Sequence, residues 1–214
     1  MTIAFDLDDT LYPEIEFVRS AYREIARRYN HPELAELMYH ASTPREAFDL
    51  AARIIGLPDA TALIEIYRNH LPDISLRPEV ESTLLALKNR GITLALITDG
   101  RSTTQRNKIA ALRLERFFDA DLIFISGETG GDKTTGLPFC LTEKAASSGP
   151  YLYVADNPAK DFFQARQRGW TTIMIMGKKD NIHSQDLSSV AEDFKPHRII
   201  YSVEKLAQMA DSQL

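Results

Sequence analysis

The hydrophobic and polar positions divide the chain into three parts. Residues 3–5 form a short apolar run that acids follow at once, which predicts a buried strand at the start of the chain. Residues 13–71 carry apolar side chains at the three- and four-residue spacing of helices, without a strand pattern. From Pro78 onward, helical and strand patterns alternate.

The middle part predicts several helices joined by turns. The capping-box sequence Thr43-Pro44-Arg45-Glu46 predicts a helix start, because the threonine can accept a backbone hydrogen bond and proline fits the first helical turn. A turn signal in residues 56–59 separates that helix from the next one. The first helix has its apolar face at Ile15, Val18, Tyr22, Ile25 and Tyr29.

The last part predicts a parallel sheet, because its strands are short and non-alternating and helices separate them. A second capping box in residues 102–105 and the pair Asn157-Pro158 are expected to start two of these helices. The polar residues 177–196 predict a loop with a short helix. The expected strands are residues 92–97, 122–125, 152–154, 173–175 and 199–201, and the expected helices are residues 78–90, 102–113, 139–147 and 158–169.

Together these parts predict an α/β fold, namely a Rossmann-like, doubly wound parallel sheet that a helical insert interrupts after the first strand. We expect residues 1–11 and 76–214 to form the α/β core. Residues 12–75 are expected to form a separate helical domain.

Composition excludes several classes of function. The chain has 214 residues and a net charge of −5, without a Lys/Arg block, which argues against a nucleic-acid binder. The single cysteine, Cys140, allows neither an internal disulfide nor a thiolate metal cluster. The longest apolar run, residues 92–97, is far too short for a bilayer, and no leader pattern precedes the acidic motif. We expect a cytoplasmic protein without a membrane partner; no feature indicates an oligomeric state.

Polar residues follow four of the expected strands. The carboxyl ends of parallel strands meet along one edge of the sheet, where ligands bind in open α/β folds, so we expect these residues to face one crevice. They are Asp6, Asp8 and Thr10 after the first strand, Thr98, Asp99 and Gly100 after the second, Lys133 after the third, and Asp156, Asn157 and Asp161 after the fourth.

These residue types suit phosphoryl transfer, which needs alignment and neutralisation of charge. An aspartate such as Asp6 can attack phosphorus and form an aspartyl-phosphate. Clustered acids need a cation, and Mg²⁺ prefers carboxylates such as those of Asp6 and Asp156 together with water and phosphate oxygens. Lys133 can pair with phosphate as a point charge. Asp8 is free to protonate the leaving oxygen and to deprotonate the attacking water.

Further phosphate donors are expected at the end of the second strand. Thr98 offers a hydroxyl group, and the backbone N–H groups of Asp99 and Gly100 lie next to the helix start at Ser102. Such consecutive amides form anion-binding nests.

In this order, the Asp6-x-Asp8-x-Thr10 motif, Thr98, Lys133 and the pair Asp156 and Asp161 resemble the haloacid dehalogenase (HAD) superfamily. The resemblance covers nearly the whole chain, and the helical insert resembles the cap of subfamily I. It implies that Asp6 is the nucleophile and that Asp8 is the general acid/base, whose backbone carbonyl also binds Mg²⁺. It further implies phosphate binding by Thr98 and Lys133 and metal binding by Asp156, with Asp161 in support.

The resemblance implies a Mg²⁺-dependent phosphatase that acts on a small phosphorylated metabolite, either a sugar phosphate or a nucleoside monophosphate. A phosphomutase retains the same motifs and is the alternative, whereas a dehalogenase lacks the second aspartate. A receiver-like signalling switch also gathers acids, a threonine and a lysine around Mg²⁺, but it lacks a cap. The intact Asp8 argues against a relative that binds phosphate without turnover.

Substrate contacts are expected where the chain enters the insert. The candidates are Tyr12, Glu14, Phe17 and Arg19. Arg101 and Gln105 are placed either at the substrate or on an exposed helix start.

Overall fold

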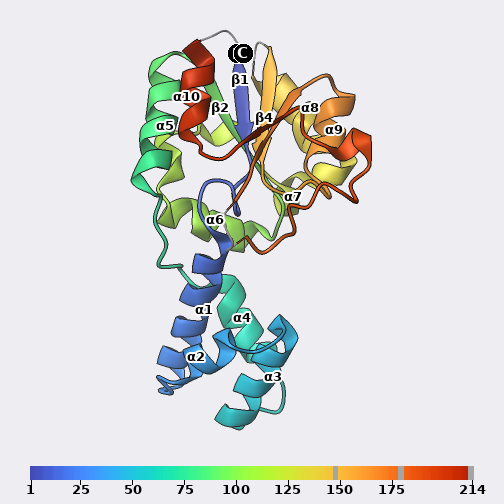
Figure 1. Cartoon of the computed structure of the whole chain (residues 1–214). Helices are drawn as coiled ribbons and strands as arrows, with labels where there is room; N and C mark the ends of the chain where they lie inside the picture. The colour runs from blue at the N-terminus through green and yellow to red at the C-terminus, as the bar shows by residue number, and fades with distance from the viewer. Residues whose placement is uncertain (147–148, 178–180, 212–214) are drawn as a thin grey trace.

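The computed structural model describes residues 1–146, 149–177 and 181–211. It contains a six-stranded parallel sheet with the strand order β3-β2-β1-β4-β5-β6 (Figure 1), which confirms the doubly wound α/β prediction. The first strand lies in the middle, so the two halves of the sheet grow outward from it. The strands are β1 (Thr2–Phe5), β2 (Thr93–Thr98), β3 (Ile123–Ile125), β4 (Tyr151–Ala155), β5 (Thr171–Ile175) and β6 (Arg198–Ile200).

Helices cover both faces of the sheet, which explains the non-alternating apolar strands. Successive side chains of β1 point to opposite faces: Ile3 and Phe5 belong to one hydrophobic cluster and Ala4 to another. In Figure 1, α5 (Pro78–Asn89) and α10 (Glu204–Asp211) lie on one side of the sheet, and α8 (Leu137–Ala145) and α9 (Phe162–Gln167) lie on the other. The short 3₁₀ helices are η1 (Leu114–Arg116), η2 (Ala120–Leu122), η3 (Lys133–Thr135) and η4 (Glu192–Phe194).

The insert after β1 is helical throughout its regular structure and has a hydrophobic cluster of its own. Tyr22, Ile25, Leu34, Met38 and Leu63 are among the buried members of this cluster. Figure 1 shows the insert beyond the carboxyl ends of the strands, next to α6 (Ser102–Ala111) and α7 (Ser126–Thr129). Its helices are α1 (Glu14–Arg28), α2 (Leu34–Tyr39), α3 (Pro44–Ile55) and α4 (Thr61–Asn69).

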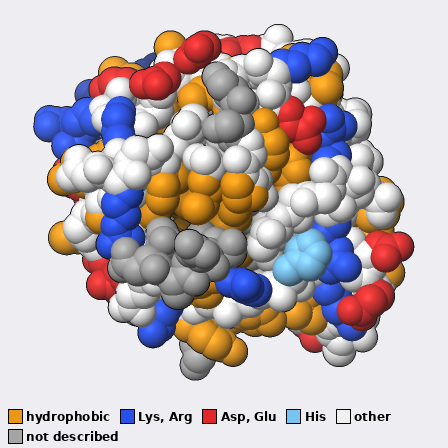
Figure 2. All heavy atoms as spheres, turned by 90° about the horizontal axis from the view of Figure 1, so that it is seen from above, with side chains coloured by type: hydrophobic (Ala, Val, Ile, Leu, Met, Phe, Trp, Pro, Cys, Tyr) orange, Lys and Arg blue, Asp and Glu red, His pale blue; other side chains and the backbone are white. Residues whose placement is uncertain are grey.

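Among the residues that the structure describes, no helical insert covers the end of the molecule at the amino ends of the strands. There, hydrophobic side chains gather in the middle of the face and charged side chains surround them (Figure 2). No helix in the described part of the chain is long and apolar enough to cross a membrane.

The first capping box forms as predicted, with one change. Thr43 Oγ1 accepts from the backbone N–H of Glu46 at 3.1 Å, whereas the Glu46 carboxylate accepts from Ser42 N rather than from Thr43 N. Gly56 then ends α3 with a φ of 80°, a left-handed conformation that glycine adopts without a steric cost.

The second predicted capping box does not form, although its helix starts at Ser102 as predicted, and the predicted start of α9 is wrong. α6 begins without a side-chain cap, because Ser102 Oγ donates to Glu128 and the Gln105 side chain turns into the protein. α9 begins at Phe162, four residues late, because Asn157 closes a local turn by accepting from Ala159 N at 3.0 Å. α8 ends at Ala145, and the predicted last residue of that helix lies outside the described residues.

Candidate active site

Lys133 lies between two buried aspartates at the carboxyl edge of the sheet. Its Nζ is 2.7 Å from Asp6 Oδ1 and 2.8 Å from Asp161 Oδ1, and the lysine is 1% exposed. Asp6 extends the β1–β4 pairing, since its N–H donates to Val154 O at 2.9 Å. The second oxygen of Asp161 accepts from the backbone N–H of Asn157 at 2.9 Å, which fixes the carboxylate that faces Lys133.

Asp156 completes a cluster of three buried carboxylates. One oxygen each from Asp6, Asp156 and Asp161 lies within 4.8 Å of the other two. Burial, and then the negative charge of the neighbouring aspartates, raises the pKa of Asp156 to about 8. Burial also raises the pKa of Asp6 to about 7, although Lys133 opposes this shift. Three carboxylates around one ammonium leave unbalanced negative charge, and an all-oxygen donor set of this kind suits a hard divalent cation.

Asp8 has a different set of partners. Its Oδ1 accepts from Lys108 Nζ at 2.7 Å and from the Tyr12 hydroxyl at 2.5 Å, and its Oδ2 accepts from Gln105 Nε2 at 3.0 Å. Burial alone would raise the pKa of Asp8, but the Lys108 ammonium and the three hydrogen bonds outweigh it and hold the pKa below its usual value. In the free protein this carboxyl group is therefore an anion at neutral pH.

The end of β2 brings Thr98 into the same network. Thr98 is 1% exposed, and its Oγ1 accepts from Gln105 Nε2 at 2.5 Å. The Asp99 carboxylate accepts from the backbone N–H of Lys133 at 3.2 Å and thus fixes the lysine loop. The Gly100 N–H donates to Ser126 Oγ at 2.9 Å, so one of the two amides expected to form an anion nest already has a partner.

The loop after Asp8 joins the core to the insert. Asp9 has a φ of 54°, and its carboxylate accepts from the backbone N–H groups of Glu14 and Ile182 at 2.9 Å each. Thr10 Oγ1 is buried and has no hydrogen-bond partner among the described residues. Asp9 therefore fixes the direction in which the chain enters α1.

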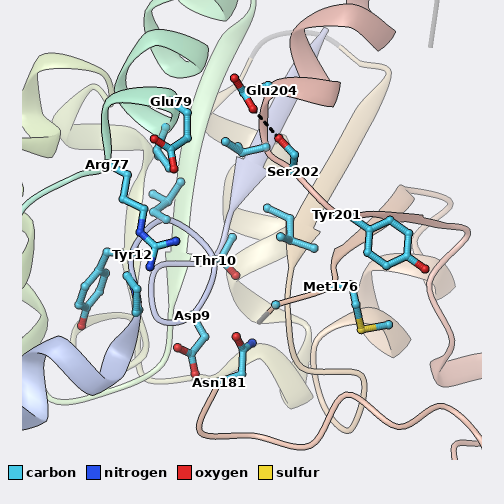
Figure 3. A pocket seen from close by; sticks show the side chains of 16 residues that line it. Asp9, Thr10, Tyr12, Arg77, Glu79, Met176, Asn181, Tyr201, Ser202 and Glu204 are labelled. Atoms are coloured by element: carbon cyan, nitrogen blue, oxygen red, sulfur yellow. Dashed lines mark hydrogen bonds between the residues drawn. The ribbon is translucent and has the colours of Figure 1, made fainter. Parts of the chain in front are cut away.

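A hollow of ≈ 450 Å³ lies beside this loop (Figure 3). Residues 9–13, the start of α5 and the segments after β5 and β6 form its walls. Neither Asp6 nor Lys133 is among its described lining residues, so it is separate from the acid cluster. Asn181 connects the two, because it lines the hollow and its Nδ2 donates to Asp156 Oδ2 at 3.3 Å.

Three of the four candidates for substrate contact lie near Asp8. Tyr12 bonds to it directly, and the Phe17 ring centroid lies 4.4 Å from Lys108 Nζ. Burial and the negative charge of Asp8 raise the pKa of Glu14 to about 7. Arg19 instead donates to the Tyr39 hydroxyl on the exposed side of the insert.

Gln105 and Arg101, for which the sequence allowed either a substrate contact or an exposed helix start, have different surroundings in the structure. Gln105 is 2% exposed and bonds to Thr98 and Asp8, so it is not part of an exposed helix start. Arg101 is exposed and lines a second hollow of ≈ 330 Å³ between α4 and the start of α6.

Lys108 is a site residue that the sequence reasoning missed. It lies one turn after Gln105 and is 3% exposed. The available signal was the composition of residues 102–111, because Ile109 is the one large apolar side chain in a helix that lies between the sheet and the insert. Such a helix must bury polar side chains, which then need buried partners.

Known proteins are similar to this chain in sequence and in fold. A sequence model described as haloacid dehalogenase-like hydrolase matches residues 3–175. The glyceraldehyde 3-phosphate phosphatase of Methanopyrus kandleri is 28% identical over 232 residues, which cover 96% of this chain and 98% of the relative. The phosphoserine phosphatase of Thermus thermophilus is 32% identical over 173 residues, which cover 77% of this chain and 68% of the relative.

A solved structure shares the fold. It belongs to a protein described as a HAD-hydrolase, YfnB from Bacillus subtilis bound to magnesium. The TM-score is 0.70 at 20% identity, and the match covers 97% of each chain.

Proposed function

Because the chain belongs to the haloacid dehalogenase-like hydrolase family, we propose that it is a Mg²⁺-dependent phosphatase that hydrolyses a small phosphorylated metabolite through an aspartyl-phosphate. The observation that carries this proposal is the contact of Lys133 with Asp6 and Asp161, next to Asp156. One buried ammonium among three carboxylates leaves negative charge that a further cation would balance, and phosphoryl transfer requires such neutralisation of charge.

The donor set around Asp6 fits Mg²⁺. The carboxylates of Asp6 and Asp156 and the backbone carbonyl of Asp8 would hold the ion, with Asp161 orienting Lys133 beside it. A bound Mg²⁺ would neutralise charge on the transferring phosphoryl group. Burial, and then the neighbouring carboxylates, raise the pKa values of Asp6 and Asp156, and a bound cation would favour the charged form of both groups.

In the first step, a carboxylate oxygen of Asp6 attacks phosphorus and the P–O bond to the leaving alcohol breaks. The electron pair of that bond goes to the ester oxygen, which takes a proton from the Asp8 carboxyl group. Thr98 and Lys133 bind the phosphoryl oxygens. Asp8 must be protonated for this step, and the negative charge of an incoming phosphate favours its protonation.

In the second step, a water molecule gives its proton to the Asp8 carboxylate and its oxygen attacks phosphorus. The bond from phosphorus to the Asp6 oxygen breaks, which releases phosphate and restores both aspartates. The free protein holds Asp8 as an anion, and this is the form that the water-activating step needs.

We further propose that residues 12–75 act as a cap over the site and that residues 1–11 and 76–214 are the catalytic core. The position of α1–α4 beyond the carboxyl ends of the strands supports this division (Figure 1). A closed cap would exclude water during the first transfer. Tyr12, Glu14 and Phe17 are the proposed substrate contacts.

The relatives' names favour small phosphate monoesters. Two of them are named for glyceraldehyde 3-phosphate and phosphoserine, each a three-carbon ester. We propose a substrate of this size class, with sugar phosphates ahead of nucleoside monophosphates.

The test is phosphate release from a panel of phosphorylated metabolites, with Mg²⁺ and with EDTA. We expect Mg²⁺-dependent release that falls by at least about 10³-fold in Asp6→Asn, because the nucleophile is lost. Asp119→Asn, an exposed aspartate of the same size, should retain the wild-type rate. An isomerised phosphosugar in place of free phosphate would indicate a phosphomutase, and a stable phosphoprotein would indicate a receiver-like switch.

A further inference from the structure

Helix α6 connects the proposed general acid/base to the helical insert. Thr104 Oγ1 donates to Arg68 O at 2.9 Å, and Asn107 Nδ2 donates to the carbonyls of Asn69 and His70 at 3.1 Å each. These carbonyls belong to the last turn of α4 and the residue after it, where helical partners are lacking. The bonds hold α6 in a fixed position, and Figure 1 shows it between the sheet and the insert.

Lys108, on the same helix, contacts Asp8. Its ammonium lies 2.7 Å from Asp8 Oδ1 and 4.4 Å from the centroid of the Phe17 ring. A buried ammonium is costly unless a charge or an aromatic face compensates it. Asp8 and Phe17 provide both, so the lysine is held at this point and in turn holds Asp8 Oδ1.

Gln105 holds the other oxygen of the same carboxyl group. Its Nε2 lies 3.0 Å from Asp8 Oδ2 and 2.5 Å from Thr98 Oγ1. A Cβ at Gly100 would lie 3.0 Å from Cγ and Cδ of Gln105, so the glycine provides the space for this side chain. Because Thr98 accepts from Gln105, its own hydroxyl proton is directed to another acceptor, such as a phosphoryl oxygen.

The two oxygens of Asp8 are therefore not equivalent. Oδ1 accepts from Lys108 and Tyr12, whereas Oδ2 accepts from Gln105 among the described residues. One amide nitrogen touches both Oδ2 and Thr98, so Oδ2 faces the side of the proposed phosphate site. Because Oδ2 accepts one hydrogen bond from the residues that the structure describes and Oδ1 accepts two, Oδ2 is the oxygen with more room to carry a proton.

We propose that Lys108 and Gln105 are positioning residues that orient Asp8 so that Oδ2 hands the proton to the leaving oxygen. The inference rests on the proposed phosphatase activity. The breaking P–O bond leaves its electron pair on the ester oxygen, the proton moves there from Oδ2, and Asp8 becomes a carboxylate that Lys108 and Gln105 stabilise.

A comparison of two leaving groups tests this role. p-Nitrophenyl phosphate releases a stable phenolate that needs no proton, whereas glycerol 3-phosphate releases an alkoxide that does. Single-turnover release of the alcohol, with enzyme in excess, isolates the first step. For Lys108→Met we expect the glycerol phosphate rate to fall by about 10²-fold or more, since general acid catalysis contributes that much, and the nitrophenyl rate to fall by less than about threefold. For Gln105→Leu, which also removes the donor to Thr98, we expect both rates to fall, and the glycerol phosphate rate to fall by at least about tenfold more than the nitrophenyl rate.

Two controls make the outcomes distinct. Arg106→Met removes a cation from the same helix, where Arg106 pairs with Glu128 on the surface, and should affect neither substrate. Lys108→Arg should recover part of the glycerol phosphate rate, because it restores the charge. If Lys108→Met does not fold, Gln105→Leu, which removes no charge, gives the same test.

In Lys108→Met or Gln105→Leu, equal losses on both substrates, or no loss on either, would overturn the positioning role of that residue while the phosphatase proposal stands. If wild-type protein hydrolyses neither ester nor any other phosphate monoester, the proposed function fails, and the positioning role fails with it.

Discussion

Lys133 and Asp6 form a buried ion pair in the middle of the candidate site, with 2.7 Å between Nζ and Oδ1. The same ammonium reaches Asp161 at 2.8 Å. Burial lowers the pKa of a lysine, but the charges of Asp161 and Asp6 outweigh it here and raise the pKa of Lys133 well above its usual value. The lysine is therefore charged at every physiological pH, and its charge stabilises the two buried carboxylates.

Replacement of Lys133 by methionine should damage both activity and stability. The variant keeps the volume and removes the charge, which leaves Asp6 and Asp161 facing each other without a cation. Breaking a buried pair on one side costs about 3–5 kcal/mol, and loss of a phosphate-binding charge should lower kcat by about 10²- to 10³-fold. Urea unfolding at pH 8 and steady-state kinetics measure the two effects.

A matched control removes a lysine from a surface ion pair. Lys195 lies 2.9 Å from Glu192, which is 80% exposed, and pairs of this kind contribute about 0–1 kcal/mol. Lys195→Met should therefore leave both activity and stability nearly unchanged. If the two methionine variants were equally stable, the buried pair would not have the importance assigned to it.

Stability without metal should fall as the pH rises from 5 to 8. Burial raises the pKa of Asp6 to about 7 and that of Asp156 to about 8, so between the unfolded value of 3.8 and these values the native state binds more protons than the unfolded state. The free energy of unfolding therefore decreases with pH in this window. The pKa of Asp8 is lowered, so this group makes the free energy of unfolding rise with pH, but it does so at pH values below this window.

Mg²⁺ should reverse this loss, because it binds the deprotonated carboxylates. We expect Mg²⁺ to raise Tm more at pH 8 than at pH 5, by about 2–4 °C for each kcal/mol of stabilisation in a chain of this size. Differential scanning calorimetry measures both series. Asp156→Asn should remove most of the Mg²⁺ effect, and a shift of equal size at both pH values would contradict the metal assignment.

The sequence predicted the acid cluster because it depends on topology alone. Asp6, Asp156 and Lys133 each follow a strand, and parallel strands bring such positions together whatever the connecting loops do. The structure places these three residues at one edge of the sheet. The helical insert could also be predicted from the sequence, because the amphipathic spacing of a helix is a local signal.

Lys108 and Gln105 were not predictable in the same way. They contact Asp8 across 100 and 97 residues of sequence, and periodicity does not tell which side of a short, polar helix faces the strand ends. The late start of α9 has a local cause, since the side chains of Asn157 and Asp161 bond to nearby backbone N–H groups in competition with the helix. Both side chains can be read from the sequence, but the sequence does not show whether the backbone N–H groups bond to them or to helical carbonyls.

Gly100→Ala should impair activity more than Gly169→Ala, although both glycines have a positive φ. Gly100 has a φ of 151°, and its new Cβ would meet the Gln105 side chain at 3.0 Å, so Gln105 would have to shift from its present position between Asp8 and Thr98. Gly169 has a φ of 77°, and no described atom lies within 4 Å of the place that an alanine methyl group would take there. Both variants should lose stability from backbone strain, by about 1–2 kcal/mol.

Only Gly100→Ala should also lose kcat, and by less than the about 10²-fold expected when a catalytic group is misplaced by about 1 Å. Thermal melts and phosphatase assays on the two variants give the comparison. A Gly100→Ala protein with wild-type kcat would show that Gln105 does not need its present position.

Asn107→Ala should loosen the contact between the insert and α6. Asn107 Nδ2 donates to two carbonyls at the end of α4, and each such bond contributes about 0.5–1.5 kcal/mol. Because the cap would then open more often, we expect a higher KM and faster proteolysis in residues 70–77, with the fold of the core intact. Asn89→Ala, an exposed asparagine at the end of α5, is the matched control and should change neither. Unchanged KM and proteolysis in Asn107→Ala would mean that α6 does not hold the insert in place, and Asp8 would then be oriented from the core alone.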